Sequence, residues 1–325
     1  GADYSDPTTG TADAGRSYVV FGKTNASAID LAAIASESGG GFVINGQASG
    51  DNSGRSVASA GDVNGDGLAD LIVGAPKSDP TAGVNAGRSY IVFGKTNASA
   101  IDLAAIASES GGGFVINGQA SGDNSGRSVA SAGDVNGDGL ADLIVGAVFG
   151  NPAAGVDAGR SYVVFGKATT TAINLSNIAD GIGGFVINGQ AADDYSGFSV
   201  ASAGDVNGDG LSDLIIGADY SDPTTGTADA GRSYVVFGKT NASAIDLAAI
   251  ASESGGGFVI NGQASGDNSG RSVASAGDVN GDGLADLIVG APKSDPTAGV
   301  NAGRSYIVFG KTNASAIDLA AIASE

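Results

Sequence analysis

The feature that most constrains the fold is an internal repeat, marked in each copy by the nine-residue segment D-V-N-G-D-G-L-[AS]-D. A fixed period of this size is typical of repeat architectures, in which each unit buries its apolar surface against its neighbours. The segment begins at Asp62, Asp134, Asp205 and Asp278, so successive units are 72, 71 and 73 residues long. Residues 1–109 also recur letter for letter as residues 217–325. We therefore describe the chain as one continuous array with units 1–73, 74–145, 146–216 and 217–289 and a half-unit 290–325.

The nine-residue segment places oxygen-bearing side chains at its first, third, fifth and ninth positions, which are Asp62, Asn64, Asp66 and Asp70 in the first copy. Calcium takes six to eight oxygen ligands at about 2.3–2.6 Å in flexible geometry, so this spacing favours a calcium loop. The glycines at the fourth and sixth positions permit sharp turns between ligands, because glycine adopts positive φ without steric cost. The carbonyl oxygen of the seventh residue, Leu68, is a further candidate ligand.

The segment begins like an EF-hand loop, but its twelfth position is Val73 instead of the expected Glu. An apolar run follows over residues 71–75, so the segment is predicted to join two β-strands. A hairpin turn without metal is the alternative, since Asn-Gly and Asp-Gly are turn signals by themselves. A bare turn does not need Asp at position nine, and we therefore favour about one Ca²⁺ per complete unit. The predicted ligands are Asp62, Asn64, Asp66, Leu68, Asp70, Asp134, Asn136, Asp138, Leu140, Asp142, Asp205, Asn207, Asp209, Leu211, Asp213, Asp278, Asn280, Asp282, Leu284 and Asp286.

Composition excludes several classes of function. The chain has 35 acidic and 15 basic residues and a net charge of −20, which four bound Ca²⁺ ions would reduce to −12. Such a charge repels nucleic acids and anionic membrane surfaces. There is no run of 18 apolar residues, so no membrane insertion is expected. Cys and His are absent, which removes disulfides, thiol chemistry and the usual general base, and we expect no enzymatic activity.

Four short strands are predicted in each unit, at residues 55–60, 71–73, 88–93 and 114–117 in the first full example. The apolar runs at 71–75 and 90–93 are continuous, which indicates strands covered on both faces, as when small sheets stack on one another. Between the third and fourth strands, residues 96–110 predict a short helix with Ser99 as its N-cap. The fold class is therefore all-β, with repeated four-stranded antiparallel blades.

The segment DVNGDGLADLIVGA followed by GRSYIVFGK resembles the FG-GAP repeat of integrin α-subunit propellers and of large bacterial surface proteins. The resemblance covers the whole chain. It implies a β-propeller in which each repeat forms a four-stranded blade and a calcium loop joins the first two strands. By the same resemblance the ligand roles fall on the positions given above, and the usual closure has seven blades.

Four units and a half do not make a ring of seven, and three arrangements stay open. A ring could be completed by the N-terminal strand at residues 16–21, two chains could complete a larger ring, or the units could continue as an open superhelix or filament. We expect a calcium-stabilised extracellular or cell-surface repeat protein, either a component of a filament or surface assembly or an adhesive propeller that binds protein or carbohydrate. Self-association is the expected partnership.

Two further motifs have weaker functional meaning. Gly22, Lys23 and Thr24 suggest a phosphate loop, but Ser17 occupies the position where that motif needs Gly. A glycosylation sequon recurs because the unit recurs, at Asn25, Asn97, Asn241 and Asn313.

Two side-chain patterns concern the blades themselves. An arginine precedes Ser-Tyr at the start of each third strand, and we expect it to be a strand-edge charge that pairs with a nearby Asp: Arg16, Arg88, Arg160, Arg232 and Arg304. The third unit diverges most, and a property peculiar to one blade would be sought first at Asp193, Asp194 and Tyr195, although the sequence favours a solvated polar turn there.

Overall fold

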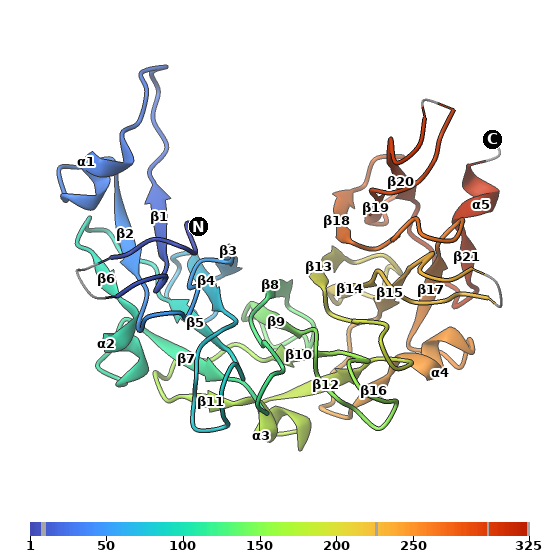
Figure 1. Ribbon diagram of the computed structural model, residues 1–325, viewed down its shortest axis with the longest axis horizontal. Coiled ribbons are helices and arrows are strands. Elements are labelled where there is room, and N and C mark those ends of the chain that lie inside the picture. Colours follow the sequence, from blue (N-terminus) through green and yellow to red (C-terminus); the bar gives the residue numbers. More distant parts are fainter. Residues whose placement is uncertain (8–10, 225–226, 298, 324–325) are drawn as a thin grey trace.

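The computed structural model describes residues 1–7, 11–224, 227–297 and 299–323. It is an all-β repeat structure of five small sheets arranged side by side in an arc (Figure 1). No helix in the described residues is long and apolar enough to span a membrane. The all-β class with repeated blades, predicted from the sequence, is confirmed.

Each complete blade has four antiparallel strands, and a two-residue strand from the next unit joins its outer edge in parallel. The second sheet contains, from its inner edge outwards, β3 (Ser56–Gly61), β4 (Asp70–Ala75), β5 (Arg88–Val92), β7 (Gly113–Asn117) and β11 (Ile173–Asn174). The third contains β8 (Ser128–Gly133), β9 (Asp142–Ala147), β10 (Arg160–Val164), β12 (Gly184–Asn188) and β16 (Ile245–Asp246). The fourth contains β13 (Ser199–Gly204), β14 (Asp213–Ala218), β15 (Arg232–Val236), β17 (Gly257–Asn261) and β21 (Ile317–Asp318).

The two outermost sheets, at opposite ends of the arc, are incomplete blades with three strands each. The first sheet consists of β1 (Arg16–Val20), β2 (Gly41–Asn45) and β6 (Ile101–Asp102), and the fifth of β18 (Ser272–Gly277), β19 (Asp286–Ala291) and β20 (Arg304–Val308). The sequence units and the blades are out of phase, because the boundary between residues 73 and 74 falls inside β4. Each blade therefore takes strands from two neighbouring units.

The predicted strands lie within two residues of those observed, and the predicted helix is present in every unit. The helices are α1 (Leu31–Ala35), α2 (Leu103–Ala107), α3 (Leu175–Ala179), α4 (Leu247–Ala251) and α5 (Leu319–Ile322). The predicted cap at Ser99 is wrong, because Asp102 stands at the N-cap of α2. Residues 101–102 are held extended in β6, which pairs with β2, so the helix cannot begin earlier.

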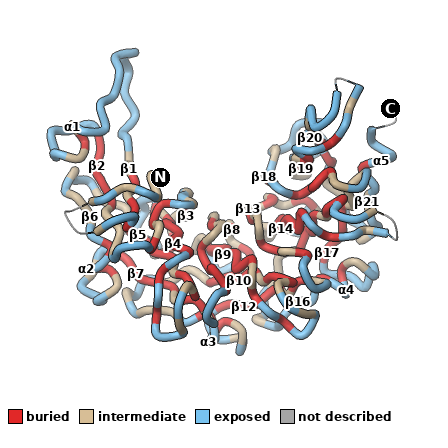
Figure 2. The backbone as a smooth tube through the Cα atoms, viewed as in Figure 1, coloured by how far each residue is buried: buried red, intermediate tan, exposed pale blue. Residues whose placement is uncertain are grey.

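The hydrophobic core lies between blades, as the continuous apolar runs predicted. One cluster joins Ile72 and Phe114 of the second blade to Leu143 and Tyr162 of the third, and Leu175 of α3 covers it. Figure 2 shows the buried strands running through the middle of the arc, with the exposed loops at its edges. Backbones approach closely at these junctions: a Cβ on Gly74 would lie 2.0 Å from the carbonyl oxygen of Gly126, so glycine is required there.

The first strands of neighbouring blades lie side by side along the concave edge of the arc, where β3 packs on β8, β8 on β13 and β13 on β18 (Figure 1). Ser side chains tie these strands together. The Oγ of Ser56 accepts a hydrogen bond from the backbone N–H of Val129 at 3.1 Å, and Ser128 accepts one from Val200 at 3.1 Å.

A glutamine beyond each outer strand connects one blade to the next. Gln119 Oε1 accepts hydrogen bonds from Arg160 Nη1 at 3.2 Å and from the hydroxyl of the fully buried Tyr162. Arg160 Nε also donates to Asn188 Oδ1 at 3.3 Å. The expectation that these arginines pair with Asp is therefore wrong, because amide oxygens on the neighbouring strand and the preceding blade reach the guanidinium first. The same glutamine contacts recur at Gln47 with Arg88 and Tyr90, Gln190 with Arg232 and Tyr234, and Gln263 with Arg304 and Tyr306.

Candidate metal centre

The four acidic loops join the first and second strands of the four blades that contain both, so all four lie on one rim of the arc. In the first loop Gly65 has φ +76° and Gly67 has φ +85°, the left-handed conformation that the sequence predicted for these two positions. A β-bulge between Ser59 and Gly61 immediately precedes the loop and turns the chain into it.

The first Asp of the loop accepts backbone hydrogen bonds from residues inside the loop. Asp62 Oδ1 accepts from Gly65 N at 2.8 Å and Asp66 N at 3.1 Å, and its Oδ2 accepts from Gly67 N at 2.8 Å. These bonds curl the backbone around the carboxylate. The equivalent bonds recur at Asp134, Asp205 and Asp278.

The third and fifth residues are linked to each other. Asn64 Oδ1 accepts from Asp66 N at 2.9 Å, and Asp66 Oδ2 accepts from Asn64 Nδ2 at 3.0 Å. Asp66 Oδ1 also accepts from the backbone N–H of Leu68 at 2.8 Å. The structure thus brings the side chains of three predicted ligands together through a network of local hydrogen bonds.

The ninth residue has a separate role. Asp70 is fully buried, and its two oxygens accept from Val63 N at 2.9 Å and Gly94 N at 2.7 Å. It therefore ties the loop to the end of the third strand. Burial raises the pKa of this carboxyl, and in the third and fourth blades it raises the pKa of Asp142 and Asp213 to about 7.

The donor chemistry of each loop fits a hard cation. Burial is the main cause of the raised Asp70 pKa, but the charges of Asp66 and Asp62 add to it, so the three carboxylates lie close enough to repel one another. A divalent cation beside them would relieve that repulsion, and oxygen donors are the ligands that Ca²⁺ prefers. As the side chains stand, no group of three or more acidic residues among those described converges closely enough to hold a metal ion. Their oxygens are engaged by backbone N–H groups.

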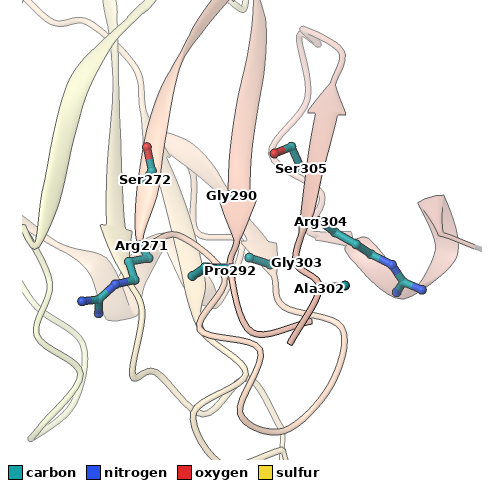
Figure 3. Close-up of a pocket in the computed structure, with 9 residues that line it drawn as sticks. Arg271, Ser272, Gly290, Pro292, Ala302, Gly303, Arg304 and Ser305 are labelled. Carbon is teal, nitrogen blue, oxygen red and sulfur yellow. The ribbon is translucent and has the colours of Figure 1, made fainter. Parts of the chain in front are cut away.

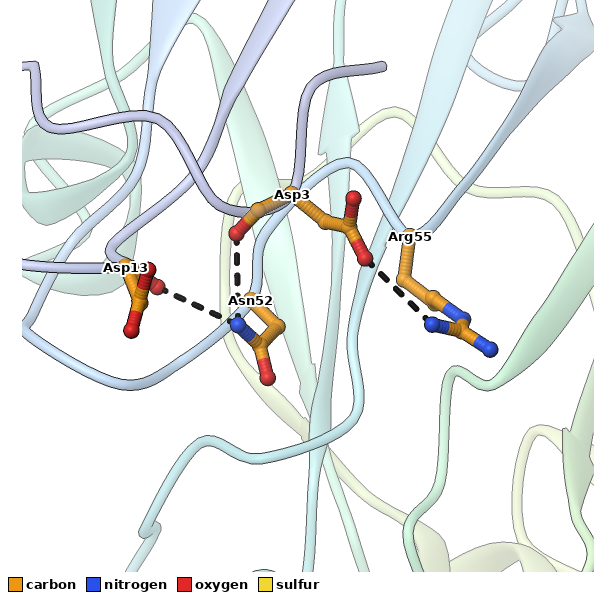
Figure 4. Close-up of polar contacts among 4 residues, drawn as sticks. All are labelled: Asp3, Asp13, Asn52 and Arg55. Carbon is orange, nitrogen blue, oxygen red and sulfur yellow. Dashed lines mark hydrogen bonds and ion pairs between the residues drawn. The ribbon is translucent and has the colours of Figure 1, made fainter.

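The opposite rim carries ion pairs at the starts of the first strands. Arg55 Nη1 lies 3.4 Å from Asp3 Oδ2, and Asn52 Nδ2 donates to the carbonyl of Asp3 at 3.3 Å (Figure 4). Three blades further on the arrangement recurs, because Arg271 lies 2.9 Å from the buried Asp219.

A cavity of about 510 Å³ in the last blade is a packing surface rather than a separate site. It is lined by residues of β18, β19 and β20 with the loops beside them, including Arg271, Gly290 and Arg304 (Figure 3). In the complete blades the glycine equivalent to Gly290 is covered by the next blade, as Gly74 is by Gly126.

Comparison with known proteins identifies the repeat. The family model described as "FG-GAP repeat" matches residues 53–92, 125–164, 196–236 and 269–308. Each match begins just before a first strand and ends at or within one residue of the end of a third strand, so it contains one acidic loop.

Relatives among curated proteins include two integrins. Integrin alpha-PS2 of Drosophila melanogaster is 33% identical over 169 residues, which are 50% of this chain and 10% of the relative. Integrin alpha pat-2 of Caenorhabditis elegans is 30% identical over 256 residues, 76% of this chain and 18% of the relative. Phosphatidylinositol-glycan-specific phospholipase D of Bos taurus is 32% identical over 165 residues, 49% of this chain and 18% of the relative. The chain thus spans less than a fifth of each of these relatives, and with four matches to one family model it belongs to the FG-GAP repeat proteins.

Proposed function

We propose that the chain is a calcium-stabilised, extracellular or cell-surface propeller module that binds a protein or carbohydrate ligand in adhesion. The observation that carries this proposal is a difference in loop sequence between the two rims of the arc. On one rim the four acidic loops are nearly identical, whereas on the other rim the loops after the second strands have three different sequences. These are PKSDPTAGVNAG at residues 76–87 and again at 292–303, VFGNPAAGVDAG at 148–159, and DYSDPTTGTADAG at 219–231. The integrin relatives support an adhesive role.

In this proposal, calcium stabilises the fold by binding to the acidic loops. Bound to a loop, the ion would be held by the side-chain oxygens at positions one, three, five and nine and by the carbonyl of the seventh residue. At about 1 mM Ca²⁺ and site dissociation constants of about 0.1–1 mM, each loop contributes about 0.4–1.4 kcal/mol. Sites of that affinity would be empty at cytosolic calcium concentrations, so the proposed stabilisation requires an extracellular location.

Surface plasmon resonance on immobilised matrix glycoproteins and a glycan array tests the ligand-binding role. We expect saturable binding in 1 mM Ca²⁺ that is lost with excess chelator and restored when calcium returns. Binding to no surface in calcium would refute the adhesive role.

A structural role in an assembly is the second candidate, and the uniform junctions favour it. Every described junction repeats the glutamine contacts and the parallel two-residue strand, so blades are joined in the same way along the array. Negative-stain micrographs of purified protein distinguish the two roles, because long filaments support assembly and discrete arcs or rings support the adhesive module.

We propose no catalytic role and no binding to nucleic acid or insertion into membranes. The chain has no Cys or His, and its net charge of −20 opposes polyanionic partners. Release of reducing ends from any polysaccharide in a screen, abolished by substitution of one acidic side chain, would contradict the first of these statements.

A further inference from the structure

An aromatic cluster lies between the third and fourth blades, on the rim opposite the acidic loops. Phe149 follows β9, Tyr220 follows β14, and Tyr195 and Phe198 precede β13. These segments lie at the ends of the strand hairpins opposite the acidic loops. Two of the rings are peculiar to this junction, because Phe198 stands where the other units have Arg55, Arg127 and Arg271, and Tyr195 where they have Asn52, Asn124 and Asn268.

The rings form the wall of a cavity. Tyr195 meets Phe149 edge to face with centroids 5.7 Å apart, and meets Tyr220 in the same manner at 5.1 Å. Together with Arg127, Val148 and Phe198 they line a cavity of about 210 Å³. Tyr220 is 36% exposed and the other three rings are half-buried, so apolar ring surface is accessible from solvent.

Arg127 gives the cavity a positive charge and has no ion pair of its own among the described residues. The charge of Asp219 acts on it, but the Asp219 carboxylate is paired with Arg271. Its equivalents Arg55 and Arg271 form ion pairs with Asp3 and Asp219, but the position equivalent to Asp3 beside Arg127 is a proline, Pro76. Within the residues that the structure describes, no acidic oxygen lies within 4 Å of the Arg127 guanidinium.

The Arg127 side chain is held in place at the cavity by Phe198. Its Cζ lies 4.8 Å from the centroid of the Phe198 ring, and Arg271 Cζ lies 4.7 Å from the same centroid. Burial lowers the pKa of Arg127, and the charges of Arg55 and Arg271 lower it further, whereas the charge of Asp219 raises it. Three arginines therefore gather on the rim of a protein that is otherwise strongly acidic, and an anion at Arg127 would relieve their repulsion.

The size and charge of the cavity define its ligand. One unpaired guanidinium matches one carboxylate, for which its forked N–H donors have the right geometry. A volume of about 210 Å³ accommodates a single six-membered ring, and aromatic walls with phenol hydroxyls suit a ring that has C–H faces and hydroxyl groups. An acidic peptide side chain would bring only one or two methylene groups and leave the rings exposed. A long polyanion would be repelled by the net charge of −20.

We propose that this cavity, lined by Arg127, Phe149, Tyr195, Phe198 and Tyr220, binds the terminal carboxylated monosaccharide of a glycan. The sugar ring packs on the aromatic side chains, and its carboxylate pairs with Arg127. This inference rests on the adhesive function proposed above, and it names the ligand class of that rim.

Titration with methyl β-D-glucuronide, observed by NMR and calorimetry, tests the site, with methyl β-D-glucoside as the uncharged probe. We expect the glucuronide to bind and Arg127→Gln to weaken it about ten- to hundredfold, the range for losing a hydrogen-bonded charge partner. The glucoside should bind the unaltered protein about as weakly as the glucuronide binds the variant. Arg55→Gln is the comparison variant, because it changes the equivalent arginine of a blade without the aromatic cavity. It should weaken binding far less than Arg127→Gln, since Arg55 acts on the site only through its charge.

The aromatic wall is tested with residues that the chain already uses at the same position. Tyr195→Asn and Phe198→Arg recreate the side chains of the other units, so the fold should persist, as circular dichroism can verify, while glucuronide binding falls. Equal binding of the two glycosides, no effect of Arg127→Gln, or binding of an acidic peptide but not of glucuronide would each overturn the assignment. If the protein still adheres to surfaces in calcium while these variants change nothing, only this site is wrong, whereas loss of all adhesion removes the proposed function itself.

Discussion

Buried carboxylates at the blade junctions differ in whether a serine hydroxyl donates a hydrogen bond to them. Asp194 accepts a hydrogen bond from Ser221 Oγ at 3.2 Å, and Asp267 accepts one from Ser294 Oγ at 2.7 Å. At the equivalent position of the divergent unit the serine is replaced by glycine, Gly150, and Asp123 Oδ2 has no partner among the described residues. Burial raises the pKa of both Asp123 and Asp194 to about 6.

Replacing Ser221 by Ala should destabilise the protein in a pH-dependent way. The pKa of Asp194 is about 6 in the fold and 3.8 ordinarily, so its stabilising contribution is complete below pH 3.8 and is lost as pH rises through 6. Ser221→Ala removes a hydrogen bond that favours the ionised form. We expect a loss of about 1–3 kcal/mol at pH 7.5 and a much smaller loss near pH 4, measured by urea unfolding. In an Asp194→Asn background the pH dependence of the loss should vanish; if it persists, another group is responsible.

Substitutions of two acidic residues in one loop should have different effects on the calcium dependence of stability. Asp138 is exposed and contacts only its own loop, whereas Asp142 is fully buried and accepts from Val135 N and Gly166 N. Asp138→Asn should therefore reduce the calcium-dependent gain in stability by about 0.4–1.4 kcal/mol and change little in chelator. Asp142→Ala leaves the buried N–H of Val135 and the half-buried N–H of Gly166 without acceptors, and it should cost about 2–5 kcal/mol with or without calcium. Calorimetry of both variants in calcium and in chelator distinguishes them, and identical responses would refute separate roles.

At the scale of elements, the blades are joined by pairings between distant parts of the chain. Each two-residue strand leaves its own unit to pair with the outer strand of the preceding blade, as β11 does with β7. The glutamine contacts lie beside that pairing, so sheet and side-chain contacts act on the same junction. Neighbouring blades should therefore unfold together.

The glutamine contact at the junction between the second and third blades can be measured directly. Gln119→Ala leaves the buried hydroxyl of Tyr162 and the Arg160 guanidinium without their shared acceptor, and should cost about 1–3 kcal/mol in urea unfolding. Tyr162→Phe removes the donor as well. A double-mutant cycle with both changes should give a coupling energy clearly above zero, and simple additivity would show that the contact contributes nothing.

For the whole molecule, stability is the sum of blades and the junctions between them, as in other linear repeats. Four loops that each gain about 0.4–1.4 kcal/mol from calcium together supply about 2–6 kcal/mol, against the total of about 5–15 kcal/mol that is common for a domain. Excess chelator should therefore lower the melting temperature by several degrees, and calcium should restore it. Equal melting temperatures in 1 mM Ca²⁺ and in chelator would exclude the stabilising role of the loops.

The sequence by itself determined the local parts of this protein. The strands are recognisable because their apolar runs are short and bounded by turn residues, and the loop network of Asp62, Asn64 and Asp66 is recognisable because all its hydrogen bonds lie within nine residues. Such contacts leave a fixed spacing in the chain, and a fourfold repeat makes that spacing easy to detect.

Only the tertiary structure decided which distant residues meet. Gln119 reaches Tyr162 across 43 positions, Arg271 reaches Asp219 across 52, and Tyr195 meets Phe149 only because two blades stack. The Arg–Asp pairing and the Ser99 cap were predicted wrongly for the same reason. A partner chosen by blade packing leaves no regular spacing in the sequence, because the separation between the two residues is set by loop lengths rather than by the period of a strand or a helix.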